Sequence, residues 1–240
     1  MTGLPDGIVA CLFDLDGVLT STAEVHRAAW KKTFDAFLRE RDPDHFSEFT
    51  DADYAQHVDG RSRADGVREF LTSRGIHLPE GCPDDAPDED TVNGVGNRKN
   101  ELLVATIEED GVTAYPGSVR YLHAVRDAGL AIGVVTSSAN GEAILEAAGL
   151  SEFVQARIDG VTIARDRLPG KPAPDAFLAG ARALDVPPSR ATVFEDALAG
   201  VAAGRAGGFG HVVGVDRAGQ AEALRRNGAD VVVTDLAQLL

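Results

Sequence analysis

The chain has 240 residues, of which 44% are hydrophobic and 25% charged, so it can build one large core or a core with a smaller second domain. Its 38 acidic and 23 basic residues give a formal net charge of −15, which argues against general binding to nucleic acid or to an anionic membrane. A small anionic substrate remains compatible with this charge, because a local group of cations can oppose it.

Cysteine content and hydropathy indicate in which cellular compartment the protein works. Cys11 falls in a predicted buried strand and Cys82 in a predicted loop, so we expect neither a disulfide nor a cysteine metal site. The N-terminus shows no basic region followed by an apolar stretch, so we expect no signal peptide. No run reaches the ~18 apolar residues of a membrane span. We therefore expect a cytoplasmic protein that does not bind membranes or nucleic acid.

The first predicted element is a buried strand that ends in two carboxylates. Residues 8–13 are continuously apolar, which is typical of a parallel strand covered on both faces. Asp14 and Asp16 follow two residues apart, so in extended chain their side chains point to the same side. Gly17 then allows the backbone to turn away. The pair is suited to holding Mg²⁺ or to sharing nucleophilic and acid/base roles, although a helix-capping pair is an alternative.

Residues 21–112 show helical periodicity and no strand pattern. The spacing of apolar residues predicts helices over 22–41 and 98–109. Another amphipathic stretch, 53–71, is interrupted at 58–63. Residues 77–94 are rich in proline, glycine and acid, which predicts a solvated loop. We interpret 21–112 as an inserted all-helical domain that separates residues 1–20 from 113–240.

Helices and strands alternate from residue 115 onward. This alternation, with the first strand, predicts an α/β fold with a doubly wound, mostly parallel, Rossmann-like sheet. The predicted strands are 131–135, 154–158, 191–194, 211–215 and 231–233, and the predicted helices are 119–128, 141–148, 174–184 and one that ends near 206.

Polar side chains follow the last apolar residue of three predicted strands. Because the carboxyl ends of parallel strands share one sheet edge, we expect these side chains to converge there. Helix capping could explain single members of the set, but it explains all of them together poorly. A lysine in the loop before the 174–184 helix could balance their charge. The converging residues are Asp14, Asp16, Thr136, Lys171, Glu195 and Asp196.

These motifs, in this order, resemble those of the haloacid dehalogenase (HAD) superfamily of phosphotransferases. The resemblance implies a Rossmann-like core with a helical cap inserted after the first motif. More narrowly, the chain is similar to the β-phosphoglucomutase family, and the similarity extends into the helical domain. The matching segments are 14–18, 22–24, 26, 29–30, 60, 62–63, 98–100, 136, 138, 140–141, 171–175 and 195–196.

The resemblance implies a catalytic role for four core residues. Asp14 would attack phosphorus and become an aspartyl phosphate, and Asp16 would act as general acid and then general base. Thr136 and Lys171 would bind the phosphoryl oxygens. These roles suit phosphoryl transfer, which depends on positioning and on neutralising the charge of the equatorial oxygens.

The resemblance also implies a Mg²⁺ site. Asp14, the backbone carbonyl of Asp16, and Asp196 would hold the ion, with Glu195 supporting it directly or through its neighbours. An aspartate is a poor nucleophile towards phosphate unless cations screen the repulsion, so the metal and the catalysis belong together.

The helical domain would supply substrate contacts by the same resemblance. Arg63 would clamp the distal phosphate of a sugar bisphosphate, a task that suits a guanidinium. His26 would link cap closure to Asp16, and Lys99 would lie near the sugar. An ordinary surface arginine and an ordinary helix histidine are the alternatives. The expected substrate-binding residues are His26, Trp30, Gly60, Arg61, Arg63, Lys99, Ser137, Ser138 and Asn140.

The cap loop departs from the mutase pattern. Asp59 stands where that pattern often has a lysine, Arg61 replaces a small apolar residue, and Ala139 replaces a lysine beside Asn140. We hypothesise that Arg61 supplies the charge of the missing lysine and works with Arg63. The alternative is that Arg61 and Asp59 are both solvated and pair weakly.

The sequence thus predicts a Mg²⁺-dependent phosphotransferase that acts on a small sugar phosphate, with a monomer as the expected state. Its most favoured activity interconverts β-glucose 1-phosphate and glucose 6-phosphate through the 1,6-bisphosphate. A sugar-phosphate phosphatase would use the same residues, so the motifs do not separate the two. A non-catalytic sugar-phosphate-binding protein is a third interpretation, which the paired Asp14 and Asp16 disfavour.

Overall fold

The computed structural model describes residues 2–240 and divides the chain into two compact units. Residues up to Ser21 form one unit together with Val112–Leu240, and we call it the core unit. The second, Thr22–Gly111, we call the helical unit. Each unit has a hydrophobic cluster of its own.

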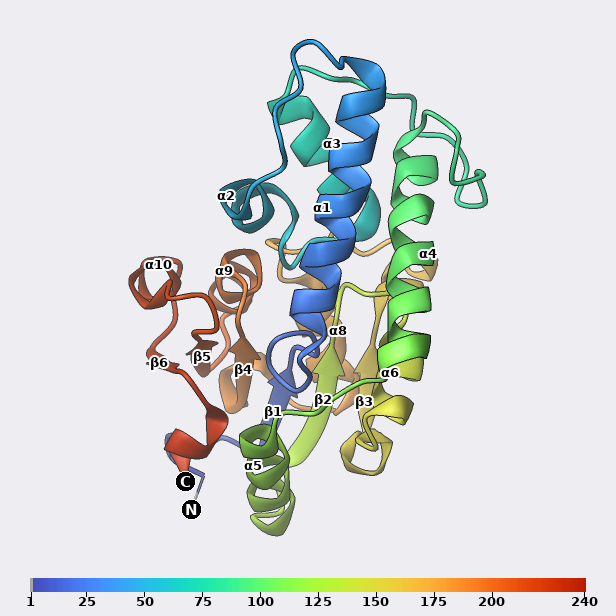
Figure 1. The fold of residues 1–240 in the computed structure, drawn as a ribbon. Helices are drawn as coiled ribbons and strands as arrows, with labels where there is room; N and C mark the ends of the chain where they lie inside the picture. Colours follow the sequence, from blue (N-terminus) through green and yellow to red (C-terminus); the bar gives the residue numbers. More distant parts are fainter. Residues whose placement is uncertain (1) are drawn as a thin grey trace. The chain divides into compact units, whose positions relative to one another are not determined.

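A single parallel sheet of six strands forms the centre of the core unit (Figure 1). Its order is β3-β2-β1-β4-β5-β6, so β1 lies between β2 and β4 and pairs with both. The parallel, doubly wound sheet predicted from the alternating pattern is confirmed. The strands are β1 (Ala10–Phe13), β2 (Ala131–Val135), β3 (Ala156–Ile158), β4 (Ala191–Glu195), β5 (His211–Val215) and β6 (Val231–Val233).

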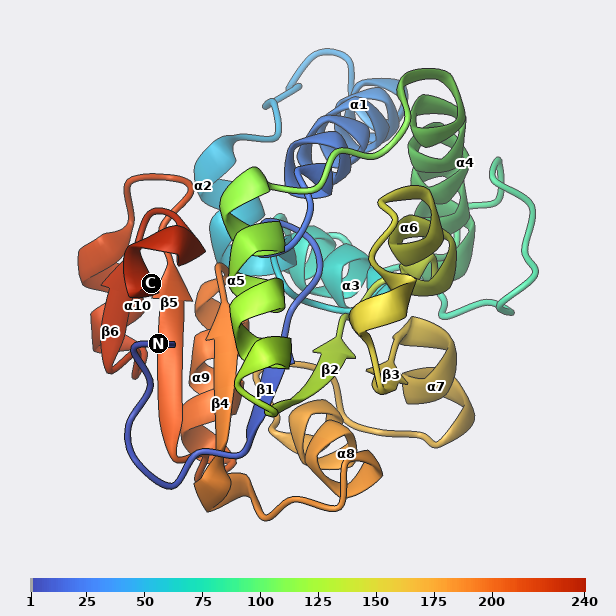
Figure 2. The same ribbon diagram turned by 90° about the horizontal axis from the view of Figure 1, so that it is seen from below.

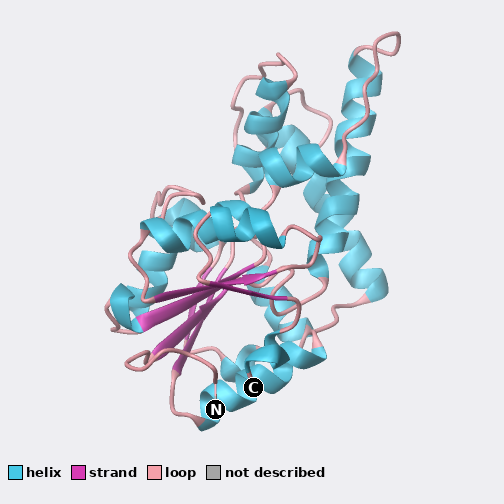
Figure 3. Ribbon diagram, turned by 90° about the vertical axis from the view of Figure 1, so that its left-hand side faces the viewer, coloured by secondary structure: helices cyan, strands magenta, loops and turns pink. Residues whose placement is uncertain are grey.

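Helices cover both faces of this sheet, as Figure 2 and Figure 3 show. Successive residues of β1 point to opposite faces. Leu12 packs in one hydrophobic cluster with Phe177 of α8, whereas Phe13 stacks on Phe194 and meets the ring edge of Tyr121 from α5. The larger helices of the unit are α5 (Pro116–Asp127), α8 (Asp175–Ala183) and α9 (Leu198–Ala206), and the short helix α10 (Ala221–Arg226) lies between β5 and β6 in the chain.

Shorter helices complete the core unit. The helix α7 was not predicted: the side chain of Asp159 accepts a hydrogen bond from the backbone N–H of Thr162 and starts a helix of only six residues. A segment that short carries too little periodicity to be recognised. The short helices are α6 (Gly141–Ala147), η2 (Ser151–Phe153), α7 (Gly160–Arg165), η3 (Pro188–Arg190) and η4 (Leu236–Leu239).

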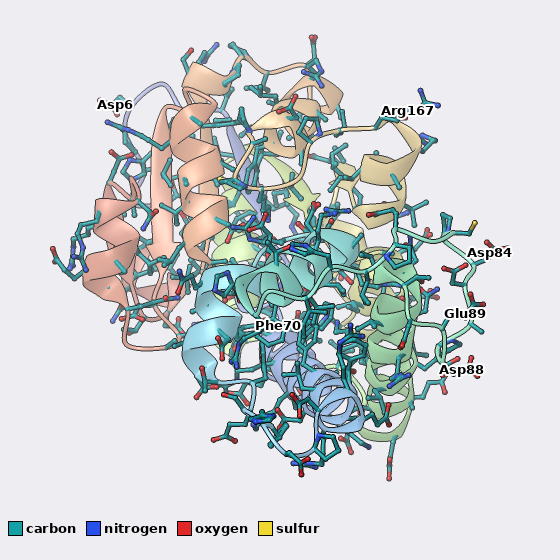
Figure 4. All side chains as sticks on the ribbon, turned by 90° about the horizontal axis from the view of Figure 1, so that it is seen from above. Asp6, Phe70, Asp84, Asp88, Glu89 and Arg167 are labelled. Atoms are coloured by element: carbon teal, nitrogen blue, oxygen red, sulfur yellow. The ribbon has the colours of Figure 1, made fainter. Side chains whose placement is uncertain are left out.

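The helical unit packs around buried aromatic rings. Trp30 stacks on Phe34 at 4.9 Å between ring centroids, and Phe34 contacts Phe49 and Phe70, which is labelled in Figure 4. This apolar cluster replaces a sheet as the core of the unit. The elements are α1 (Thr22–Arg41), α2 (Asp51–Asp53), the π-helix η1 (Tyr54–Val58), α3 (Arg63–Ser73) and α4 (Val92–Asp110).

The helix α4 begins six residues before the predicted start. Thr91 is its N-cap, and its side chain accepts a hydrogen bond from the backbone N–H of Gly94 at 2.9 Å. The predicted loop over 77–94 was therefore wrong for 92–94, where the capping threonine outweighs the low helix propensity of the local sequence. Asp84, Asp88 and Glu89 project outward from the preceding loop in Figure 4.

Among residues 2–240, none of the helices combines the length and the apolar composition that crossing a membrane requires.

Candidate active site

The parallel register of the sheet brings the polar residues of three strands to one edge. Asp14 directly follows β1, Thr136 follows β2, and Glu195 is the last residue of β4. The backbone N–H of Asp14 still donates to the carbonyl of Phe194 at 2.9 Å, so the β1–β4 ladder continues into the site. The first carboxylate is thereby fixed to a rigid sheet edge and does not depend on a flexible loop.

A buried lysine joins two of these carboxylates. Lys171, from the loop before α8, donates from Nζ to Oδ1 of Asp14 and to Oε1 of Glu195, both at 2.5 Å. The Lys171 and Glu195 side chains are fully buried. The second oxygen of Glu195 accepts the backbone N–H of Ala197 at 3.0 Å, which orients that carboxylate. The predicted balancing lysine thus contacts the predicted acids directly.

Burial and charge act in opposite directions at this ion pair. Burial alone would lower the pKa of Lys171, but the carboxylates of Asp14 and Glu195 outweigh it and raise that pKa, so Lys171 is a cation. Burial raises the pKa of Asp14, Lys171 opposes this shift, and the neighbouring Glu195 and Asp16 add to it. The cluster therefore has more carboxylates than one ammonium group can balance.

Three carboxylates at this edge fit a divalent cation. Oxygen atoms of Asp14, Glu195 and Asp196 all lie within 4.8 Å of one another, and the three residues are buried. These three carboxyl groups outnumber the single ammonium of Lys171. Carboxylate oxygens are the ligands that Mg²⁺ prefers. Asp16 is not part of this carboxylate group, and its predicted contribution through the backbone carbonyl stays a prediction.

Gly17 allows Asp196 to approach the first motif. Gly17 has a φ of +86°, and a Cβ built on it would lie 1.9 Å from Oδ2 of Asp196. Only glycine accommodates both the left-handed backbone and the close carboxylate. The two acid-bearing loops are therefore in direct contact.

The loop after β2 presents hydroxyl groups to the same edge. Thr136 donates from Oγ1 to Oδ2 of Asp16 at 3.3 Å and accepts the backbone N–H of Ser138 at 3.1 Å. The hydroxyl of Ser138 in turn accepts the backbone N–H of Asn140 at 3.2 Å. Thr136 thus lies beside the proposed acid/base, and Ser137, Ser138 and Asn140 follow it in one turn before α6.

In the helical unit, Arg63 is held by two amides. Its Nη1 donates to Oδ1 of Asn97 at 2.7 Å and its Nη2 to Oδ1 of Asn100 at 3.0 Å, both on α4. Gly96 lies under the arginine stem, since a Cβ there would be 3.0 Å from the Arg63 Cδ. Burial lowers the pKa of Arg63, yet a guanidinium stays charged. The acceptors that hold this cation are therefore neutral and leave its charge in place.

Lys99, His26 and Trp30 form a second cluster in the same unit. Lys99 is 4% exposed, its Nζ lies 3.1 Å from Nδ1 of His26, and the ammonium lies 5.1 Å from the Trp30 ring centroid. Trp30 is itself 4% exposed within the aromatic core, so its ring serves packing. The cluster therefore joins α1 and α4 through a buried ammonium, and its role in substrate binding stays a prediction.

The cap loop lies between η1 and α3. Gly60 has a φ of +73°, which turns the chain, and the backbone N–H of Arg61 closes the turn by donating to the carbonyl of Val58 at 3.1 Å. Arg61 is half-buried. Its role beside Arg63, and that of Asp59, stay predictions.

Sequence reasoning missed several residues that hold the site together. Asn97 precedes the recognised segment 98–100 and has no motif of its own. Arg217 and Gln220, in the loop after β5, reach backbone carbonyls beside the acidic residues. The sequence could have indicated that the loop after β5 also contributes, because the carboxyl end of this parallel strand lies at the same edge.

Known proteins with similar sequences place the chain in a family. A model of haloacid dehalogenase-like hydrolases matches residues 8–208, which is most of the chain. The chain belongs to the haloacid dehalogenase superfamily. It is an enzyme of that superfamily, as its sequence motifs predicted.

Individual relatives are similar over almost their full length. The chain is 56% identical to proteins named beta-phosphoglucomutase from Mycobacterium bovis and Mycobacterium tuberculosis, across 99% of this chain and 94% of theirs. It is 32% identical to beta-phosphoglucomutase of Bacillus subtilis, across 96% of this chain and 91% of that protein. The crystal structure of beta-phosphoglucomutase from Clostridium difficile superposes with a TM-score of 0.76 at 27% identity, covering 97% and 93% of the two chains.

Proposed function

We propose that this enzyme is a Mg²⁺-dependent phosphotransferase that forms an aspartyl phosphate on Asp14 and interconverts β-glucose 1-phosphate and glucose 6-phosphate through the 1,6-bisphosphate. The observation that carries the proposal is the buried group of Asp14, Lys171 and Glu195 beside Asp196 at the carboxyl edge of the sheet. The name of the 56% identical relatives supports the choice of sugar phosphate.

Asp14 is the nucleophile in this mechanism. Its Oδ1 is bound to Lys171, which orients the carboxylate and leaves Oδ2 to attack phosphorus. Lys171 also offers positive charge to the phosphoryl oxygens as the nucleophile approaches, and the hydroxyl of Thr136 donates to another of them. Preorganised donors of this kind stabilise charge that develops in the transition state.

Asp16 moves the proton. Thr136 donates to Oδ2 of Asp16, so the carboxyl group is held next to the position where the leaving oxygen departs. Asp16 protonates that oxygen as Asp14 becomes phosphorylated. It then removes a proton from the sugar hydroxyl that takes the phosphoryl group back.

The residues Asp14, Asp196 and the backbone carbonyl of Asp16 would hold Mg²⁺, with Glu195 orienting Lys171 beside them. When bound, the ion neutralises negative charge on the phosphoryl oxygens and on the carboxylate cluster. The surplus of carboxylates over the single ammonium of Lys171 is the property of this chain that suits such an ion.

Arg63 distinguishes the two phosphates of a sugar bisphosphate in this proposal. Its guanidinium is half-buried and bound to the neutral amides of Asn97 and Asn100, so it keeps its full charge for an anion. A distal phosphate would accept from it in bidentate fashion. Such a clamp favours a bisphosphate intermediate that reorients in the site, which is what a mutase needs.

A product assay tests the proposal. Purified enzyme is given β-glucose 1-phosphate, Mg²⁺ and a trace of glucose 1,6-bisphosphate, and glucose 6-phosphate and inorganic phosphate are measured together. We expect glucose 6-phosphate to form with almost no phosphate release, and we expect no turnover when a chelator removes the metal.

A sugar-phosphate phosphatase is the second candidate, favoured by the description of the matching family as hydrolases. Water would then take the phosphoryl group from Asp14 with the help of Asp16. Stoichiometric release of phosphate in the same assay would support that function and reject the mutase.

A further inference from the structure

The loop that follows β5 contacts both of the loops that carry the acidic residues. From this loop, Arg217 donates from Nε to the carbonyl of Gly17 at 2.8 Å. Three residues later, Gln220 donates from Nε2 to the carbonyl of Asp196 at 3.0 Å. One short segment thus binds the backbone immediately after Asp16 and the backbone of Asp196 itself.

Several hydrogen bonds hold the backbone of this loop in place. Asp216, directly after β5, accepts the backbone N–H groups of Ala218, Gln220 and Ala221 at 3.3, 2.8 and 3.2 Å. Its own N–H donates to the carbonyl of Val233 at 2.7 Å, which ties the loop to the end of β6. The side chain of Gln220 therefore extends from a backbone that is held at several points.

Arg217 makes two further contacts and leaves one nitrogen without a partner in the described part of the chain. Its Nη1 donates to the carbonyl of Thr234 at 2.8 Å, and its guanidinium carbon lies 3.7 Å from the ring centroid of Tyr115. Its Nη2 is buried and has no hydrogen-bond partner within residues 2–240. A buried donor without an acceptor lowers the stability of the fold, so packing alone does not explain why an arginine occupies position 217. The hydrogen bond to the Gly17 carbonyl explains it better.

We infer that Arg217 and Gln220 are positioning residues that set the spacing between the Asp16–Gly17 backbone and Asp196, and so tune the site for Mg²⁺. This inference rests on the proposed function, since it assigns metal binding to that edge. The direct contact of Gly17 with the Asp196 carboxylate makes the spacing sensitive, because a small shift of either carbonyl moves a ligand group. Mg²⁺ demands near-ideal octahedral geometry, so it responds to such shifts more than a larger cation does.

Calorimetric titration with Mg²⁺ alone tests the inference without relying on turnover. The variants are Arg217→Met, which keeps the stem without the donors, Arg217→Lys, which keeps the charge and one donor group, and Gln220→Met. Arg225→Met is the matched control, because Arg225 lies on α10 in an exposed pair with Glu222 at 3.9 Å. The melting temperature of every variant is measured in chelator to separate folding from metal binding.

We expect Arg217→Met to weaken Mg²⁺ binding about tenfold and Gln220→Met about fivefold, as the loss of one charged and one neutral hydrogen bond implies. Arg217→Lys should recover part of the loss, and Arg225→Met should bind as the wild type does. Ca²⁺ affinity should fall less than Mg²⁺ affinity in the first two variants.

Unchanged Mg²⁺ affinity in Arg217→Met and Gln220→Met would overturn the inference, even if their melting temperatures fell, and would leave the proposed function intact. Failure of the wild-type protein to bind Mg²⁺ would overturn the metal site and the inference together. If Arg217→Met does not fold, Gln220→Met alone decides, since its side chain makes a single bond to the Asp196 carbonyl.

Discussion

Lys171 in the core unit and Arg63 in the helical unit are both withdrawn from water, but their partners differ. Lys171 is fully buried between two carboxylates, whereas Arg63 is half-buried between two neutral amides. A cation that is already neutralised can orient its partners and stabilise them. A cation bound only by amides keeps its charge for an anion that arrives from outside. On the proposed function, the comparison separates a residue suited to organising catalysis from one suited to selecting the ligand.

Removing the core cation should have the largest effect. We predict that Lys171→Met abolishes turnover and destabilises the protein by about 3–5 kcal/mol, because it leaves the carboxylates of Asp14 and Glu195 buried together without compensation. Chemical denaturation with and without Mg²⁺ measures this. The loss should be smaller with Mg²⁺, since the ion can take over part of the neutralisation. Equal losses in Mg²⁺ and in chelator would contradict the account of a metal site at Asp14.

Changing Asp16, the proposed proton-transfer residue, should lower the rate without a comparable loss of stability. For Asp16→Asn we expect a fall in kcat of ~10²–10⁴-fold, the usual contribution of general acid/base catalysis. Mg²⁺ affinity should change little, because the proposed metal contact of Asp16 is its backbone carbonyl. A normal kcat combined with lost Mg²⁺ binding would assign the Asp16 carboxylate to the metal instead.

Truncating Arg63 should lower activity only with phosphoryl donors that carry a second, distal phosphate. We predict that Arg63→Ala lowers kcat/KM for glucose 1,6-bisphosphate by an amount equivalent to ~1.5–3 kcal/mol of activation free energy, the range for a lost charge-assisted contact. Reaction with a small acyl phosphate should be nearly unchanged. Arg61→Ala should show a weaker effect of the same kind if Arg61 supplements the clamp. Arg68→Ala is the control, because Arg68 is already paired with Asp65 and Glu80. Equal losses on both donors would indicate general damage to the helical unit.

A single substitution can give Arg63 a carboxylate partner, as Lys171 has. Asn97→Asp would place a carboxylate where an amide oxygen now accepts from Arg63 at 2.7 Å. We expect KM for the bisphosphate to rise more in Asn97→Asp than in Asn97→Ala, where only one hydrogen bond to the guanidinium, of ~1.5–3 kcal/mol, is lost. Steady-state kinetics at low ionic strength give the comparison. A larger effect for alanine would mean that Asn97 acts only by holding the side chain in place.

The sequence predicted which strand-end side chains would meet at one edge, because strand ends are local signals and a parallel sheet aligns them. The strand pattern was sufficient to place Asp14, Thr136 and Glu195 there. Contacts between distant loops have no such signal. The hydrogen bond of Arg217 to Gly17 joins residues 200 positions apart, and neither local sequence predicts it.

Helix boundaries in the helical unit were less predictable for a different reason. Glycine at 94 and 96 and the acidic, proline-rich segment before them suggest a loop. The N-cap at Thr91 and the packing of Val92 and Val95 in the aromatic cluster make helix the lower-energy state there. The partner of Arg63 on this part of α4, Asn97, was missed with the boundary.

The phosphorylation site tests the central claim most directly. The Asp16→Ala variant, in which breakdown of the intermediate should be slow, is incubated with a small acyl phosphate and Mg²⁺, and peptides are then located by mass spectrometry. We predict one added phosphoryl group on Asp14, absent when Mg²⁺ is chelated and absent in a variant that also carries Asp14→Asn. A phosphoryl group on any other residue, or none on Asp14 while the wild-type enzyme turns over, would contradict the account.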